Sequence, residues 1–369
     1  MRVLLTNATD IFAGGEDYVL ILARQLGIRG HDVCVSALPG HLLLEKCTAA
    51  GIPVLPLHYR GMHRVFGVGA ELRREMRRRG TEIVHSNANY DRTAAAIAAW
   101  GGRARHVAGV HSAHSIRHNL THAVRNRWGV DAFIADAEAV RNVLVQQDGI
   151  APARVEVIPI GVEEEPAGEH DRAEARASWG AGPRTIVVGN VARLVPFKGH
   201  RYLLDAASRV LRVRKDVLFV IVGDGELEEA LRAQALALGV EGSVRFLGFR
   251  DNLHTLYPGF DIYAHSSLEL AAEAFPIAIL RALASSLPVV ATDAGGIGLM
   301  VRQGVNGELV RPEDPGALAE SLLGAAADPG RRRMWGAASG RLFHSEFHAA
   351  VMADRVEALY RRVAEGGRP

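Results

Sequence analysis

Short runs of Val, Ile and Leu alternate along the chain with longer segments whose apolar residues recur at helical spacing. This alternation predicts parallel sheets flanked by helices. One series of predicted strands comprises Val3–Leu5, Val33–Val35, Val54–Leu55, Ile83–Val84, His106–Val110, Ala132–Ala135 and Val155–Ile158. A second comprises Thr185–Val191, Leu218–Val222, Val244–Phe246, Ile262–Ala264, Val289–Ala291 and Glu308–Val310. We therefore expect an α/β protein with two doubly wound domains, whose ligands bind at the carboxyl ends of the strands.

The segment from Gly161 to Arg184 separates the two series. It is rich in Pro, Gly and acidic residues and contains no strand-like run, so it is the predicted linker. We place the domains at residues 1–165 and 166–345. Apolar residues recur near helical spacing from Glu346 to Ala364, which predicts a terminal helix. The pattern leaves open whether this helix caps the second domain or returns to the first.

Composition narrows the classes of protein. The 369 residues fit two domains, and 43 Lys and Arg against 41 Asp and Glu leave no large cationic field for nucleic acid. The two cysteines do not support a disulfide framework or a zinc site, so we expect a reducing compartment. The initial apolar stretch is too short for a signal peptide, and no run of about 18 apolar residues occurs. We expect a cytoplasmic location.

Two glycines follow the first predicted strand. Gly14 and Gly15 precede a helix, so backbone amides there can approach an anion or an oxygen-rich group. Adjacent glycines do not make the three-glycine fingerprint of dinucleotide-binding proteins. An ordinary tight turn is the alternative interpretation.

Two cations follow the first strand of the second series. Arg193 and Lys198 are five residues apart on a loop that enters a helix, and Lys198 is one of only three lysines in the chain. Such a pair can clamp a diphosphate. The alternative is a solvated surface.

A third candidate site lies around Pro276, which suits the first turn of a helix. Free amides in that turn, near Ala274, Phe275 and Ile277, can hold phosphate. Glu273 lies just outside, where an ionised carboxylate can accept hydrogen bonds from sugar hydroxyls or serve only as an N-cap.

Polar side chains in the first domain predict an acceptor site. His85, Asn87, Asn89 and Asp91 surround the end of a predicted strand, although each also fits a plain loop residue. Two basic stretches, which begin at Glu71 and Arg117, allow peripheral contact with an anionic membrane or merely solvated helix faces. Leu120, Val124 and Trp128 in the second stretch also fit a core stripe.

In their order and spacing, these motifs resemble the retaining family 4 glycosyltransferases of the GT-B fold, over essentially the whole chain. The resemblance rests on the early Gly-Gly pair, RLVPFKG from Arg193, IVGDGELEEAL from Ile221, RFLGFRDNL from Arg245 and EAFPIAILRALASSLPVVATDAGG from Glu273. It implies two facing Rossmann-like domains with a cleft between them. It also implies that a C-terminal helix, about residues 346–366, returns to the first domain.

The resemblance implies roles for particular residues. Arg193 and Lys198 would bind the donor diphosphate, and Glu273 would hold the donor sugar. His111 would stand against the sugar, with His114 as its rival and a lone surface histidine as the alternative for either. The remaining donor-site residues would be Gly14, Gly15, Phe249, Arg250, Ala274, Phe275, Pro276, Ile277 and Arg281.

Arg281 departs from the family pattern, which places a second Glu at that position to accept hydrogen bonds from both ribose hydroxyls. Arginine can only donate hydrogen bonds. Three explanations stay open: Arg281 donates to ribose or phosphate, it pairs with a carboxylate such as Glu269 that takes over the ribose contact, or donor binding is weakened.

The expected activity is transfer of a hexose from a nucleotide-sugar, UDP- or GDP-linked, to a hydroxyl of a glycan, a lipid-linked acceptor or a natural product. By the resemblance, the acceptor attacks from the face that the diphosphate leaves, so configuration is retained. We expect no cofactor and no metal, since no cluster has metal-ligand spacing. GT-B epimerases and phosphorylases are the competing enzymes, and a non-catalytic or partner-dependent GT-B subunit is the alternative that Arg281 motivates.

Overall fold

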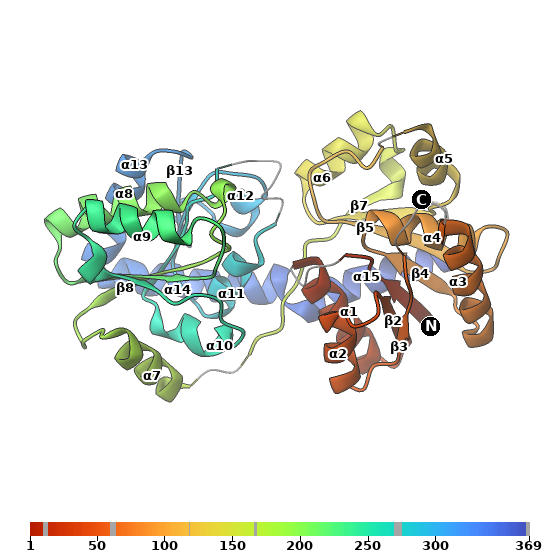
Figure 1. Cartoon of the computed structure of the whole chain (residues 1–369), viewed down its shortest axis with the longest axis horizontal. Helices are drawn as coiled ribbons and strands as arrows, with labels where there is room; N and C mark the ends of the chain where they lie inside the picture. Colours follow the sequence, from red (N-terminus) through yellow and green to blue (C-terminus); the bar gives the residue numbers. More distant parts are fainter. Residues whose placement is uncertain (10–13, 60–63, 118, 166–167, 269–274, 367–369) are drawn as a thin grey trace. The chain divides into compact units, whose positions relative to one another are not determined.

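The computed structural model describes residues 1–9, 14–59, 64–117, 119–165, 168–268 and 275–366. The chain forms two compact units. Unit 1 comprises Met1–Glu163 together with the segment from Glu346 onward, and unit 2 comprises Glu164–Ser345. Each unit contains its own parallel sheet with helices on both faces (Figure 1).

Unit 1 contains a seven-stranded sheet in the order β3-β2-β1-β4-β5-β6-β7, and every pairing is parallel. The strands are β1 (Arg2–Thr6), β2 (Asp32–Ala37), β3 (Val54–Pro56), β4 (Ile83–Ser86), β5 (Arg105–Val110), β6 (Ala132–Ala135) and β7 (Val155–Val157). The helices are α1 (Gly14–Ile28), α2 (Leu42–Ala49), α3 (Val65–Arg79), α4 (Asn89–Ala99), α5 (Leu120–Trp128), α6 (Glu138–Asn142) and α15 (Ala349–Ala364). The strand order changes direction between β1 and β4, which is where open α/β sheets bind ligands.

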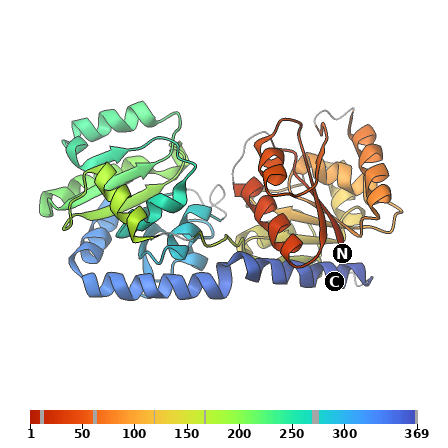
Figure 2. The same ribbon diagram turned by 90° about the horizontal axis from the view of Figure 1, so that it is seen from below.

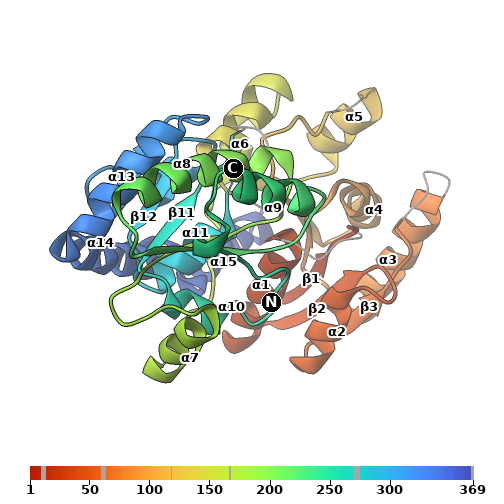
Figure 3. The ribbon, with the colours of Figure 1, turned by 60° about the vertical axis from the view of Figure 1, so that its left-hand side comes forward.

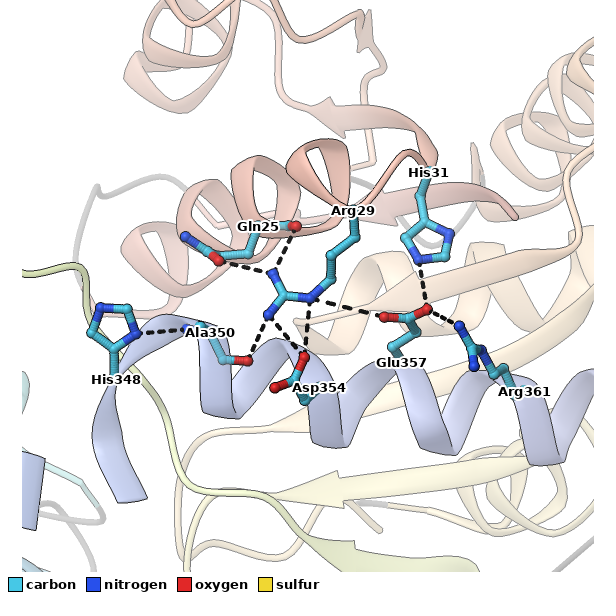
Figure 4. Close-up of polar contacts among 8 residues, drawn as sticks. All are labelled: Gln25, Arg29, His31, His348, Ala350, Asp354, Glu357 and Arg361. Atoms are coloured by element: carbon cyan, nitrogen blue, oxygen red, sulfur yellow. Dashed lines mark hydrogen bonds and ion pairs between the residues drawn. The ribbon is translucent and has the colours of Figure 1, made fainter. Parts of the chain in front are cut away.

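Helix α15 packs against α1 within unit 1 (Figure 2). Its apolar face is buried, and Val356, Leu359 and Tyr360 are inaccessible. The contact also carries charge: the Arg29 guanidinium donates to the Ala350 carbonyl at 2.8 Å and to Asp354 at 2.9 Å (Figure 4). This chain-terminal segment is thus an integral part of unit 1.

Unit 2 contains a six-stranded parallel sheet in the order β10-β9-β8-β11-β12-β13. The strands are β8 (Ile186–Val191), β9 (Val217–Val222), β10 (Val244–Phe246), β11 (Ile262–His265), β12 (Val289–Thr292) and β13 (Gly307–Val310). The helices are α7 (Glu169–Trp179), α8 (His200–Val213), α9 (Glu228–Ala237), α10 (Leu253–Leu256), α11 (Ile277–Ala284), α12 (Ile297–Met300), α13 (Pro315–Ala327) and α14 (Pro329–Leu342). Helices α8 and α13 lie side by side over a core that includes Leu204, Phe219 and Leu322 (Figure 3).

The α/β prediction is confirmed, because each of the thirteen predicted strands is present within two residues of its expected bounds. The predicted linker is wrong in part, because residues 169–179 form helix α7 of unit 2. Arg172 and Arg176 of α7 each bind the Asp261 carboxylate, at 2.7 and 2.9 Å. The Trp179 ring stacks on Phe260 with centroids 5.4 Å apart. The two ion pairs and the stacked rings together hold α7 against the rest of unit 2, although this segment contains no strand-like run.

His106 on β5 is buried in unit 1 as a neutral ring. Its Nδ1 lies 2.6 Å from the Gly129 carbonyl and its Nε2 lies 2.8 Å from Ser86 Oγ. Burial lowers the pKa of His106 from 6.5 to about 3. Between these two values the folded protein binds fewer protons than the unfolded chain, so the stability present at pH 7 is lost as the pH falls.

We expect His106 alone to lower the free energy of unfolding by about 2 kcal/mol between pH 7 and pH 5. His106→Asn should remove this part of the pH dependence, although it also destabilises the protein at pH 7. His170→Asn is the matched control, because the His170 side chain is 90% exposed. Urea unfolding at both pH values measures the difference, and an unchanged pH dependence in His106→Asn would contradict the assignment.

Candidate functional site

The loops that follow β8, β9, β10, β11 and β12 lie on one side of the unit 2 sheet, because all its strands are parallel. We call this side, where the carboxyl ends of the strands lie, the carboxyl edge of the sheet. Hydrogen bonds connect each loop to the next. The backbone donors and acceptors are Gly223 N to Gly248 O (2.9 Å), Leu194 N to Asp224 O (2.7 Å) and Leu268 N to Phe197 O (2.8 Å). Two side chains donate further hydrogen bonds between the loops. Ser266 Oγ donates to Lys198 O (2.9 Å), and Thr292 Oγ1 donates to Ser267 O (2.6 Å). This network holds the loop backbones in place.

Glycines make this close packing of loops possible. Gly199 has φ +65°, and a Cβ there would lie 2.0 Å from the Ser266 carbonyl oxygen. At Gly223, with φ +135°, a Cβ would lie 2.1 Å from the Ala192 carbonyl oxygen. Both positions therefore exclude any side chain, and they keep the β8 loop against its two neighbours.

Arg193 and Lys198 both lie on the loop after β8, at the edge described above. Arg193 is exposed, and its guanidinium has no hydrogen-bond or ion-pair partner within the described ranges. Lys198 ends a short 3₁₀ turn, Pro196–Lys198, and its Nζ lies 5.4 Å from the centroid of the Phe197 ring. The loop thus presents two cations beside the start of α8, an arrangement that can hold an anion.

Helix α11 begins at Ile277, and Pro276 precedes it as the N-cap residue, so Pro276 is not in the first turn as expected. Phe275 and Pro276 are buried, and Ile277 is partly exposed. The first amides of α11 follow the β11 loop at the same edge of the sheet. Glu273 and Ala274, and also Glu269, lie outside the described residues.

Arg281 on α11 forms an ion pair with a residue that the sequence analysis did not single out. Its guanidinium lies 2.9 Å from Glu165 Oε1, and His254 Nδ1 lies 3.0 Å from the other oxygen of Glu165. Of the three explanations for Arg281, this contact matches pairing with a carboxylate. Glu165 lies in the segment predicted as linker, where no periodicity marked it.

The loop after β10 presents an aromatic side chain. Phe249 is 66% exposed, and Arg250 beside it is also exposed. Gly248 joins this loop to the β9 loop through the hydrogen bond from Gly223. An exposed ring on an anchored backbone can stack on a planar ligand.

In unit 1, Gly14 and Gly15 are the first two residues of α1, so they do not form a turn before it. A Cβ at Gly15 would meet nothing within 4 Å. There is therefore open space beside Gly15 on the surface of α1. Glu16 in the same turn accepts a hydrogen bond from Asn7 Nδ2 at 3.0 Å.

His111 follows β5 and belongs to a polar cluster at the carboxyl edge of the unit 1 sheet. Its Nδ1 lies 3.7 Å from Asp136 Oδ2, and its Nε2 lies 3.3 Å from Asn87 Oδ1. The Tyr18 ring packs against it, with centroids 4.6 Å apart. His114, its rival, is exposed and lies outside this cluster. Asp136 and Tyr18 were missed in the sequence, although Asp136 directly follows a predicted strand.

The four predicted acceptor residues are engaged within unit 1. Asp91 is fully buried and accepts hydrogen bonds from Thr6 Oγ1 and from the amides that precede α4. Burial raises its pKa to about 6. His85 is fully buried, with Nδ1 2.6 Å from Tyr360 Oη, and Asn89 accepts from Arg125 at 2.9 Å. Asp91 and His85 therefore expose no surface to an acceptor. Asp91 stabilises the junction between β4 and α4 instead, and His85 contacts α15.

An apolar groove of about 740 Å³ runs along α4. Phe66, Tyr90 and Trp100 line it and are all largely exposed. On α5, Leu120 and Trp128 are 76% and 52% exposed, so this stripe does not pack into a core. An exposed apolar surface of this kind is typical of a site that binds an apolar ligand.

Within the described ranges, no helix is long and apolar enough to cross a membrane. The same residues contain no group of three or more His, Cys, Asp or Glu that could hold a metal ion. Both cysteines are buried and free, and burial raises the pKa of each thiol to about 11.

Known families match both units. The family model described as Glycosyltransferase Family 4 matches residues 12–166, and that described as Glycosyl transferases group 1 matches residues 171–341. The chain belongs to the family 4 glycosyltransferases.

Relatives of this family 4 chain include the D-inositol 3-phosphate glycosyltransferase of Segniliparus rotundus, 31% identical over 64% of this chain and 53% of that protein. A GDP-mannose-dependent monoacylated alpha-(1-6)-phosphatidylinositol monomannoside mannosyltransferase of Corynebacterium glutamicum is 33% identical over 54% of each chain. The chain thus matches about half the length of these curated relatives.

Solved structures show the GT-B fold. A glycosyltransferase from Rickettsia africae superposes with a TM-score of 0.90 at 17% identity and covers 99% of both chains. Anabaena HepE in complex with UDP-glucose superposes with a TM-score of 0.83 at 24% identity, over 97% of this chain and 99% of that one.

Gly199→Ala should destabilise this family 4 chain strongly, because the new Cβ would collide with the Ser266 carbonyl oxygen. Gly239→Ala is the matched control: its φ is +67°, but its Cβ would meet nothing within 4 Å. We expect the control to cost about 1 to 2 kcal/mol and Gly199→Ala at least about 2 kcal/mol more. Urea unfolding measures both variants, and equal losses would show that the loops do not need this close approach.

Proposed function

We propose that the protein is a retaining, metal-independent glycosyltransferase that moves a hexose from a UDP- or GDP-sugar to a hydroxyl group. The supporting observation is the loop after β8, where two cations, Lys198 and the exposed Arg193, lie at the carboxyl edge of unit 2. Family membership supports transfer as the reaction. The UDP-glucose complex of HepE and the GDP-mannose-dependent relative support the donor class.

In the proposed reaction, the acceptor oxygen bonds to the anomeric carbon as the bond from that carbon to the diphosphate breaks. The diphosphate keeps the electron pair and takes the acceptor proton. Arg193, Lys198 and the first amides of α11 would offset its charge. This leaving-group stabilisation needs no metal.

Further donor contacts follow the family resemblance. Glu273 would accept hydrogen bonds from sugar hydroxyls, and the exposed Phe249 and Arg250 would lie beside the nucleobase. Ala274, Phe275 and Pro276 would shape the loop before α11. Glu165, held by Arg281 and His254, would supply the carboxylate that accepts hydrogen bonds from the ribose hydroxyls.

The acceptor would bind unit 1, and Gly14 and Gly15 at the start of α1 would contact the donor. His111 would contact the transferred sugar. The exposed apolar side chains of α5 and the groove along α4 support an acceptor with an apolar part, such as a lipid-linked one. They also support a peripheral contact with a membrane.

The test is a titration of the purified protein with UDP, GDP, ADP and dTDP in the presence of EDTA, followed by the matching nucleotide-sugars. Micromolar binding of UDP or GDP, about −8 kcal/mol, is expected. Turnover of the nucleotide-sugar with a hydroxyl acceptor, with the anomeric configuration followed by NMR, then tests transfer and retention. Absence of binding by every nucleotide would overturn the proposal.

Arg193→Ala should weaken binding of the nucleoside diphosphate about tenfold or more, because a charge-assisted contact to phosphate is lost. Arg184→Ala is the matched control, since Arg184 is an exposed arginine at the opposite end of β8. Calorimetric titration measures both variants. Equal affinities in the two variants would remove Arg193 from the diphosphate site.

Arg281→Glu should lower nucleotide affinity about tenfold, because a second carboxylate would repel Glu165 and displace it from the proposed ribose contact. Arg214→Glu provides the control. Arg214 pairs with Asp216 at 2.6 Å just before β9, at the amino ends of the strands and therefore away from the proposed site. Unchanged nucleotide affinity in Arg281→Glu would contradict the proposal that Glu165, held by Arg281, contacts the ribose.

A further inference from the structure

Asp136 is a buried carboxylate that no hydrogen bond compensates. It directly follows β6, and its side chain is only 2% exposed. Neither of its oxygens has a hydrogen-bond partner anywhere in the described chain. Because burial of an unpaired charge is costly, an ionised Asp136 requires a nearby positive group.

His111 is the group that can supply that charge. Its Nδ1 is 3.7 Å from Asp136 Oδ2, and its Nε2 faces Asn87 Oδ1 at 3.3 Å. The orientation of the Asn87 amide is set independently, because its Nδ2 donates to the Thr6 carbonyl at 3.0 Å. Both ring nitrogens therefore face oxygen atoms, and with Asp136 ionised the ring satisfies both contacts only when it carries two protons.

Among the residues that the structure describes, the other groups around this ring do not provide a cation to Asp136. Burial, with Asp136 as a smaller cause, raises the pKa of the Tyr18 hydroxyl on α1. Burial, with His111 as a smaller cause, lowers the pKa of His85 on β4, so His85 stays neutral. The Arg92 guanidinium on α4 donates to the Gly109 carbonyl at 2.9 Å. Tyr360 of α15 contacts His85 rather than His111.

Space in the cluster is tight. A Cβ on Gly109 would lie 2.8 Å from Asn87 Oδ1, 3.0 Å from His85 Nε2 and 3.1 Å from His111 Nε2. The His111 ring is thus confined between Gly109, Tyr18 and Asp136. Its side chain keeps 15% of its surface exposed, so one edge of the ring remains accessible.

We propose that Asp136 is a positioning residue that holds His111 in its doubly protonated form and in a fixed orientation. The Asp136 carboxylate balances the charge of the protonated Nδ1 as an ion pair at 3.7 Å, and the Nε2–H donates to Asn87. That second contact is longer than an ordinary N–H···O bond, so the same proton is available to an oxygen of the transferred sugar. This assignment rests on the proposed function for the role of the sugar, but the state of the ring can be measured without it.

The experiment compares Asp136→Asn with Asp131→Asn in the full-length protein. The two aspartates flank β6 at opposite ends, and Asp131 instead accepts from the His106 amide at 2.9 Å. The ¹⁵N chemical shifts of the His111 ring at pH 7, assigned with His111→Gln, report which nitrogens carry protons. We expect two protonated nitrogens in the wild type and in Asp131→Asn, and one in Asp136→Asn.

Kinetics provide the second measurement. Asp136→Asn should lower kcat at least tenfold with an unchanged dissociation constant for the donor, and it should have no further effect in the His111→Gln background. A wild-type ring with one unprotonated nitrogen, or additive losses in the double variant, would overturn the proposal. If the protein binds no nucleotide, the proposed function fails, whereas the NMR comparison still decides the state of His111.

Discussion

Parallel strand pairing places the carboxyl end of every strand of a sheet at one edge, and the candidate residues of both units depend on this. In unit 2, the loops at that edge are joined by hydrogen bonds from Gly248 through Leu194 to Thr292. This alignment brings Arg193 and the start of α11, more than 80 residues apart in sequence, to the same edge of the sheet. Three of these contacts join backbone atoms only, so they do not engage the side chains of the loops.

Strand positions could be predicted because a buried parallel strand has to be a run of apolar residues. The candidate residues Arg193 and Lys198 could be singled out for a related reason, since they follow such a run directly. Helix α7 could not be recognised in the same way, because its docking depends on two arginines that reach Asp261, 85 or more residues away. A contact over that distance leaves no periodic signal in the local sequence.

The polar residues of unit 1 show a second limit of sequence reasoning. Asp91 and Asp136 both follow strands of one sheet, and both are buried, yet only Asp91 has its oxygens bonded to nearby donors. Spacing along the chain cannot distinguish a carboxylate that caps a helix from one that faces a histidine. The exposed stripe on α5 is a similar case, because helical spacing of apolar residues does not say what covers them.

Unit 1 is assembled from two separate stretches of the chain, whereas unit 2 is continuous. During synthesis the first 163 residues emerge early, but the surface of α1 that α15 covers stays bare until residues 349–364 have left the ribosome. Unit 2 can complete its fold in that interval, since domains fold as units while the chain grows. Unit 1, of which residues 1–163 are synthesised before unit 2, would then finish folding after it.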